Sequence, residues 1–117
     1  MGFDVYGQCP TAPEGHHFRR TVFHWPFIVD LCLDLAPRQI RRFGLWRDHY
    51  RDGLNAKRSL RLANRLEQLI SDGSVARYIE GLRTSEPEAW AEEEWLAEND
   101  IREFIGFLKF CGGFVIS

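Results

Sequence analysis

The sequence lacks a long apolar run, and it lacks an excess of charge of either sign. The longest uncharged apolar stretch covers the nine residues 21–29, whereas a membrane-spanning helix needs about 20. The formal net charge is −2, from 15 basic and 17 acidic side chains, which excludes a globally basic nucleic-acid binder. The first residues carry an acid at Asp4 and neither a basic nor an apolar region, so no secretory signal is expected.

Cysteine is also scarce. Cys9, Cys32 and Cys111 cannot all pair with one another, and no C-x-x-C motif occurs. Cys32 and Cys111 lie among apolar residues, where cysteine is more often a small core residue than a nucleophile. These features predict a cytoplasmic protein in a reducing compartment.

The residues that are present suffice for one folded domain over residues 1–117. Hydrophobic residues make up 44% of the chain and aromatic residues 14%. A chain of this size buries about two-thirds of the surface that its unfolded form exposes. The aromatic content excludes intrinsic disorder, and no metal or disulfide is needed to complete a core.

Two short strands are predicted near the ends of the sequence. Residues 3–6 alternate apolar and polar side chains before Gly7, and residues 114–116 follow the pair Gly112-Gly113. Neither strand can satisfy its backbone hydrogen bonds alone, so we expect the first to pair with the last. Residues 8–16 are predicted to form a loop, and residues 18–25 fit no single type of element.

Apolar residues at helical spacing occupy most of the remaining chain. The clearest helix is predicted over residues 55–72, with Asn55 as N-cap and Gly73 in the left-handed position that ends it. Other helices are expected after Pro26, after a cap at Ser74, after the capping box at residues 85–88, and from about Asp100. The predicted fold is α+β and predominantly α-helical, with four to five helices and a small sheet pairing the N- and C-terminal strands.

Both ends of the chain carry short sequence motifs that also occur together in other proteins. Residues 1–7 read M-G-F-D-V-Y-G, residues 15–19 read G-H-H-F-R, and residues 102–114 contain E-F-x-x-F-L and G-G-F. In these segments, and in a histidine-containing turn at residues 48–53, the chain resembles a group of small bacterial and phage proteins with no assigned activity. This chain has fewer aromatic residues before the first helix than many members. The resemblance implies a shared fold and no particular chemistry.

Charge is unevenly distributed along the sequence. Residues 38–65 hold nine basic residues against two acidic ones, and residues 86–103 hold eight acidic residues against one arginine. On the predicted helix, four of the basic side chains fall within about 100° of one another. These side chains are Lys57, Arg58, Arg61 and Arg65, here named the basic stripe. Such a stripe is typical of phosphate binding, unless it is neutralised by the acidic segment or is merely a solvated face.

Catalytic and metal-binding motifs are missing. The sequence has no G-x-S-x-G, no glycine-rich phosphate loop and no paired cysteine motif. His49 and Asp52 are the candidates for a metal site, but an aspartate before a glycine is equally explained by a turn. Consecutive Glu92-Glu93-Glu94 point in different directions from a helix and indicate a solvated run. We therefore expect no cofactor and find no support for an enzyme.

The aromatic residues exceed what one helical face can bury. Trp90 and Trp95 lie about 140° apart on a helical wheel, and Phe110 points about 180° away from the apolar face of the last helix. Either neighbouring elements cover these residues, or some are exposed at an interface. The first functional hypothesis is thus a non-enzymatic protein-interaction domain, with a protein partner or a second copy, and no membrane. The alternative is binding of an anionic ligand or nucleic acid through the basic stripe, and the third is a metal-assisted enzyme.

Overall fold

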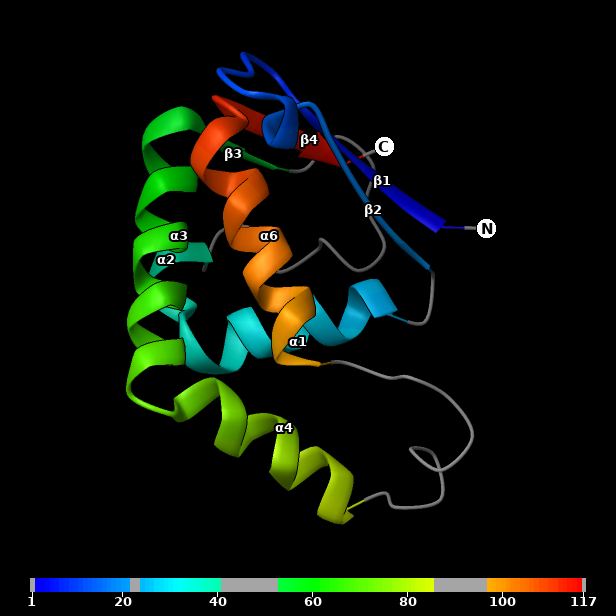
Figure 1. The fold of residues 1–117 in the computed structure, drawn as a ribbon, viewed down its shortest axis with the longest axis vertical. Coiled ribbons are helices and arrows are strands. Elements are labelled where there is room, and N and C mark those ends of the chain that lie inside the picture. The colour runs from blue at the N-terminus through cyan, green and yellow to red at the C-terminus, as the bar shows by residue number, and fades with distance from the viewer. Residues whose placement is uncertain (1, 22–23, 41–52, 86–96, 117) are drawn as a thin grey trace.

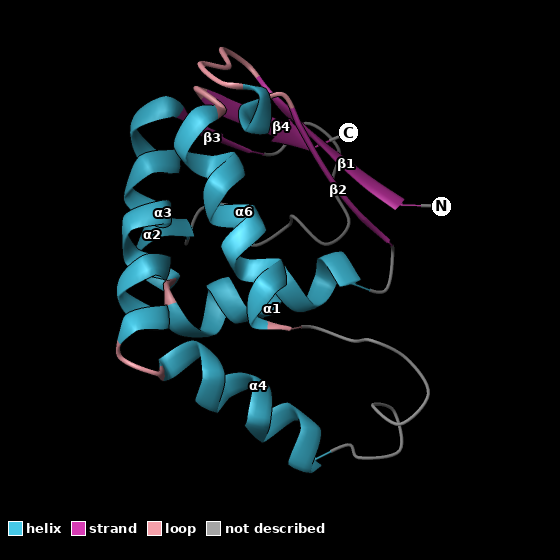
Figure 2. Cartoon of the chain, viewed as in Figure 1, coloured by secondary structure: helices cyan, strands magenta, loops and turns pink. Residues whose placement is uncertain are grey.

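The computed structural model describes residues 2–21, 24–40, 53–85 and 97–116. Figure 1 follows these segments along the chain, and Figure 2 separates helices from strands. The strands are β1 (Gly2–Gly7), β2 (His17–Thr21), β3 (Gly53–Asn55) and β4 (Gly113–Ile116). The helices are α1 (His24–Leu35), α2 (Pro37–Ile40), α3 (Ala56–Ser71), α4 (Ser74–Ser85) and α6 (Glu98–Phe110), with a 3₁₀ turn at Pro13–Gly15.

The strands form one antiparallel sheet in the order β2-β1-β4-β3. Val5 lies opposite Ile116 and Gly7 lies opposite Phe114, so the predicted pairing of the first strand with the last is confirmed. The predominantly helical α+β fold is confirmed with it. β2 and β3 were not predicted, because β2 is rich in basic residues and β3 has three residues, too few to show alternation.

The α3 helix ends where the sequence predicts. The Asn55 side-chain oxygen accepts a hydrogen bond from the Arg58 backbone N–H at 2.8 Å, which caps the N-terminus. Gly73 has φ +84°, a left-handed conformation that other residues resist. Ser74, in contrast, is the first residue of α4 rather than its cap, and Asp72 accepts its backbone N–H at 2.8 Å.

The α6 helix begins two residues earlier than its predicted start. The Asp100 carboxylate accepts the backbone N–H of Ala97 at 2.9 Å, so Asp100 caps the helix from inside its first turn. The helix ends at the predicted glycines, where Gly112 and Gly113 have φ of +63° and +94°. The predicted helix is therefore correct, and its start is shifted by two residues.

The core is built around aromatic rings from four elements. Trp25 of α1 meets Phe104 of α6 edge-on, with ring centres 5.7 Å apart, and Phe18 of β2 and Phe114 of β4 pack against the same helix. Pairs of this kind contribute roughly 0.5–1.5 kcal/mol beyond their buried area. This cluster fixes α6 against the sheet, while α3 runs beside α6 (Figure 1).

The cysteines lie as the sequence predicts. Cys32 and Cys111 are buried and Cys9 is exposed, and none of the three forms a disulfide. Burial raises the pKa of the Cys32 thiol to about 12. A thiol with this pKa is protonated near neutral pH and is a poor nucleophile.

Candidate binding surfaces on the two sides of α3

The exposed face of α3 carries the basic stripe. Lys57 and Arg61 are exposed, and Arg58 and Arg65 are partly buried. The apolar residues Leu62, Leu66 and Leu69 point the other way into the core. Because the helix is capped and buried along its opposite face, the backbone holds the basic side chains in a fixed order along one outer surface of the molecule.

A hollow lies beside the stripe, between α2 and α3. Its volume is about 530 Å³, and its lining residues are Leu35, Pro37, Arg38, Gln39, Arg65 and Gln68. The Arg65 guanidinium donates a weak hydrogen bond to the Gln68 side-chain oxygen at 3.4 Å. Two guanidinium groups and two amides thus border one concave polar space, which is suited to an oxyanion.

Within the described part of the chain, one acid that acts on the stripe is Asp72, the C-cap of α3, which interacts electrostatically with Arg65 without forming an ion pair. None of the ion pairs formed among the described residues involves Arg38, Lys57, Arg61 or Arg65. The sequence left open whether the acidic segment covers the stripe. Most of that segment, residues 86–96, lies outside the described residues.

The described acids of the same segment have other partners. Arg20 of β2 donates to Asp100 at 3.0 Å and also pairs with Glu103, and its guanidinium lies 4.4 Å from the centre of the Phe18 ring. Glu98 pairs with Arg102 one turn along α6. These acids therefore anchor α6 to the sheet and balance α6 itself.

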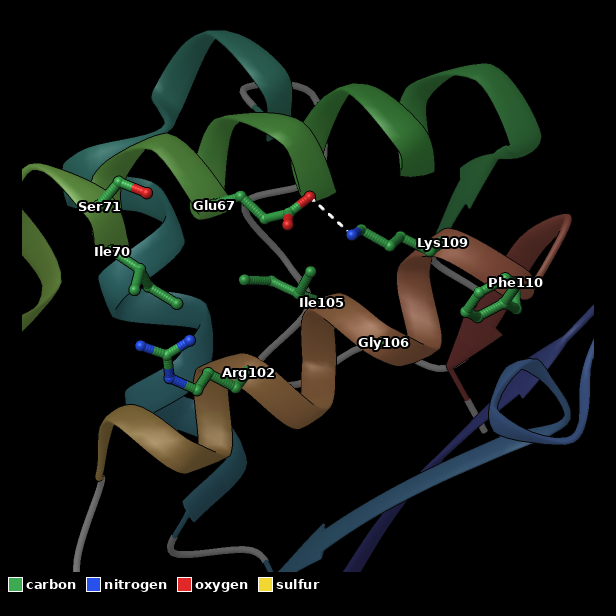
Figure 3. A pocket seen from close by; sticks show the side chains of 8 residues that line it. All are labelled: Glu67, Ile70, Ser71, Arg102, Ile105, Gly106, Lys109 and Phe110. Carbon is green, nitrogen blue, oxygen red and sulfur yellow. Dashed lines mark ion pairs between the residues drawn. The ribbon is translucent and has the colours of Figure 1, made fainter.

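The opposite side of α3 faces α6 across a groove of about 370 Å³. The residues around it are Glu67, Ile70, Ser71, Arg102, Ile105, Gly106, Lys109 and Phe110 (Figure 3). Lys109 Nζ lies 2.9 Å from the Glu67 carboxylate, and this ion pair bridges the two helices (Figure 3). With Arg102 paired to Glu98, the two cations of this groove each have an acidic partner.

Two residues give the groove its shape. Phe110 is 37% exposed at one end, as its predicted position opposite the apolar face requires. Gly106 lies in the middle of α6, and a Cβ added to it would meet no atom within 4 Å. A helical glycine costs roughly 0.5–1 kcal/mol relative to alanine, and the packing of the described residues does not require one here.

Several residues singled out from the sequence lie outside the described segments. These are Trp90 and Trp95 of the predicted interface, and His49 and Asp52 of the predicted metal site. In the segments that the structure does describe, no group of three or more His, Cys, Asp or Glu side chains could hold a metal ion. In those same segments, no helix combines the length and the apolar character that crossing a membrane requires.

The sequence analysis did not single out Arg38 or Gln68 as site residues. Gln68 belongs to the stripe by spacing, since it follows Arg61 by seven residues and Arg65 by three. Arg38 reaches the same surface through the turn between α1 and α2, which periodicity does not describe. The helical spacing of Gln68 could have been found in the sequence. The position of Arg38 depends on tertiary packing and could not.

Comparisons with known proteins add no family to this description. No protein-family model matches the chain, and no curated protein or solved structure shows significant similarity to it. The resemblance of the two ends of the chain to small bacterial and phage proteins stays an expectation.

Proposed function

We propose that this chain is a non-enzymatic binding domain for an anionic ligand, which it holds on the α2 side of α3. The observation that carries the proposal is the hollow bordered by Arg38 and Arg65, with Lys57 and Arg61 exposed at earlier positions of the same helix. Among the described residues these four cations form no ion pair, and Asp72 interacts with Arg65 only at longer range. Guanidinium groups bind phosphate and carboxylate oxygens in a bidentate manner, so two of them facing one hollow favour an oxyanion.

Calorimetric titration with sodium tripolyphosphate in 50 mM NaCl tests this proposal. We expect saturable binding that weakens as salt is added, because counter-ions screen exposed charges. The double variant Arg38→Ala/Arg65→Ala should weaken binding by about tenfold or more, since each charge-assisted hydrogen bond contributes roughly 1.5–3 kcal/mol.

The control removes the same charge from the other side of α3. Arg102→Ala/Lys109→Ala changes the net charge equally, but both side chains are paired with acids. We expect this variant to bind tripolyphosphate within about twofold of the unaltered protein, because distant surface charges are largely screened. Absence of binding at low salt, or equal weakening by both double variants, would overturn the proposal.

Protein interaction is the second candidate function, and Phe110 is the observation that favours it. A large apolar ring that is 37% exposed beside a groove is typical of an interface centre. Sedimentation velocity over a wide range of protein concentration tests self-association through this groove. A mass that rises with concentration, and stays monomeric in Phe110→Ser, supports it, whereas a monomer at every concentration contradicts it.

A further inference from the structure

We infer that α3 is a recognition helix for double-stranded DNA, which lies in the major groove with its exposed face against the base edges. This inference rests on the proposed function and names its ligand. It goes beyond phosphate binding because two uncharged side chains, Asn64 and Gln68, are assigned to hydrogen-bond the edges of the bases.

The exposed face of α3 holds side chains of two chemical kinds, cationic and amide. On a helical wheel, Lys57, Arg61, Asn64 and Gln68 fall within about 60°, and Arg58 and Arg65 occupy the next 60°. No other residue of α3 falls in this 120° sector, and the acid nearest to it in sequence is the C-cap Asp72, just beyond the last turn. The four central residues are all exposed.

This combination of side chains matches base edges better than a single anion. Arginine donates two hydrogen bonds to guanine O6 and N7, and asparagine and glutamine pair with adenine N6 and N7 in the major groove. An amide can donate to a phosphate oxygen, but only a base edge offers it a donor and an acceptor side by side. Asn64 and Gln68, with Lys57 between them and Arg61 beside Gln68 on the wheel, therefore point to base reading.

The dimensions of the face also fit a duplex. Eleven residues separate Lys57 from Gln68, which corresponds to about 16 Å along the helix axis and about five base pairs. An α-helix with its side chains is about 10–12 Å wide, close to the width of the major groove. Figure 1 shows α3 along one outer edge of the molecule, where a groove could receive it.

The flanks of α3 supply the remaining contacts. Arg38 and Arg65, at the hollow, lie where a phosphate of the groove rim would pass. On the other flank, the Glu67 carboxylate is neutralised by Lys109, so it would not repel a phosphate backbone strongly. An anionic membrane is a poorer ligand because the sector has no apolar side chain to insert. A single strand is also poorer, since the sector has no aromatic ring for stacking.

Fluorescence anisotropy with a labelled 20-base-pair duplex tests the inference, together with selection from a randomised duplex library. About four phosphate contacts predict a slope near −3.6 for log K against log salt concentration, and a loss of roughly 100-fold between 50 and 200 mM salt. The selection should return a consensus sequence of about five base pairs. Arg38→Ala should reduce the slope by about 1 and weaken all sequences alike.

The amide variants separate base reading from phosphate binding. Asn64→Ala and Gln68→Ala should each weaken the selected duplex about 5- to 150-fold and relax the consensus at one position, with an unchanged slope. Asn64→Ala should leave the binding of tripolyphosphate unchanged, because Asn64 is not among the residues that line the hollow, whereas Gln68 is. Asn99→Ala removes an exposed amide from α6 and should leave DNA binding unchanged.

Failure of this inference is distinguishable from failure of the proposed function. Binding of tripolyphosphate without a duplex consensus overturns the recognition helix and leaves the anion site. Equal affinity for a single-stranded 20-mer, or binding to phosphatidylglycerol vesicles in place of DNA, also overturns the recognition helix. If neither tripolyphosphate nor duplex DNA binds at 50 mM salt, both proposals are wrong.

Discussion

The two sides of α3 differ in how their charges are balanced. On the α6 side, Lys109 pairs with Glu67 and Arg102 pairs with Glu98 across or along a groove. On the α2 side, Arg38 and Arg65 border a hollow of similar scale and form no ion pair among the described residues. The net charge therefore does not describe the local charge. The chain has a net charge of −2, and one side of α3 is still basic.

The largest effect on ligand binding is expected from charge reversal on the basic side of α3. Arg61→Glu/Arg65→Glu should weaken tripolyphosphate binding by roughly 100-fold or more, because attraction becomes repulsion at the site. Stability should stay within about 0.5 kcal/mol, since both side chains lie on the solvent-facing side of the helix. Calorimetry and urea unfolding measure the two quantities.

The matched variant for that prediction is Arg102→Glu/Lys109→Glu. It changes the formal charge by the same amount on the balanced side, and we expect it to weaken binding by less than about threefold at 150 mM salt. Comparable losses from the two double variants would show that overall charge, rather than the α2 side of α3, determines binding.

The next effect concerns Arg20, which links β2 to two acids of α6. Arg20 is 18% exposed and pairs with Asp100 and Glu103. Arg20→Ala should lower the free energy of unfolding by about 2 kcal/mol, because it leaves a partly buried carboxylate uncompensated. Urea unfolding measures this loss, and Arg19→Ala, at a side chain that is 56% exposed, should cost less than about 0.5 kcal/mol. Equal losses would contradict the role of Arg20 as the anchor between β2 and α6.

A smaller effect tests whether the groove on the α6 side is open. Gly106→Ala should raise the free energy of unfolding by roughly 0.5–1 kcal/mol, because alanine favours helix and the added methyl group meets open space. Gly81 in α4 has the same open surroundings, so Gly81→Ala serves as the matched variant. If Gly81→Ala stabilises the protein and Gly106→Ala destabilises it, the groove beside Gly106 is filled rather than open.

The smallest effect comes from the ion pair that balances the groove. Both Glu67 and Lys109 are more than a third exposed, so Glu67→Ala should cost only about 0.3–0.5 kcal/mol after solvent screening is considered. Thermal unfolding measures it, with Glu80→Ala on α4 as the reference variant. A cost above about 1 kcal/mol would mean that the pair stabilises the fold rather than merely neutralising Lys109.

The sequence predicts which helices and strands form better than it predicts their first and last residues. Helix α3 follows from the spacing of its apolar residues, from Asn55 and from Gly73, because these features act locally. The pairing of β1 with β4 follows because neither strand can satisfy its backbone hydrogen bonds alone. β2 was not predicted because Phe18 is buried by tertiary contacts while its neighbours are basic. The capping role of Asp100 was not predicted, because an aspartate near a helix start can serve at the N-cap or two to three residues later.

The candidate site was predictable to a similar degree. The stripe on α3 and the exposure of Phe110 follow from helical geometry, which the sequence contains. The approach of Arg38 to Arg65 depends on how α2 packs against α3, and the Lys109–Glu67 bridge depends on how α6 packs there. Both are long-range contacts, which no periodicity along one helix encodes.

Mapping the ligand by NMR tests the central claim most directly, because it asks which side of α3 is occupied. Tripolyphosphate is titrated into ¹⁵N-labelled protein at 50 mM salt, and amide and arginine Nε–H signals are followed. We expect the largest shifts in residues 38–40 and 57–68, including the Nε–H signals of Arg38 and Arg65. Shifts concentrated in residues 102–110, or no shifts at all, would contradict it.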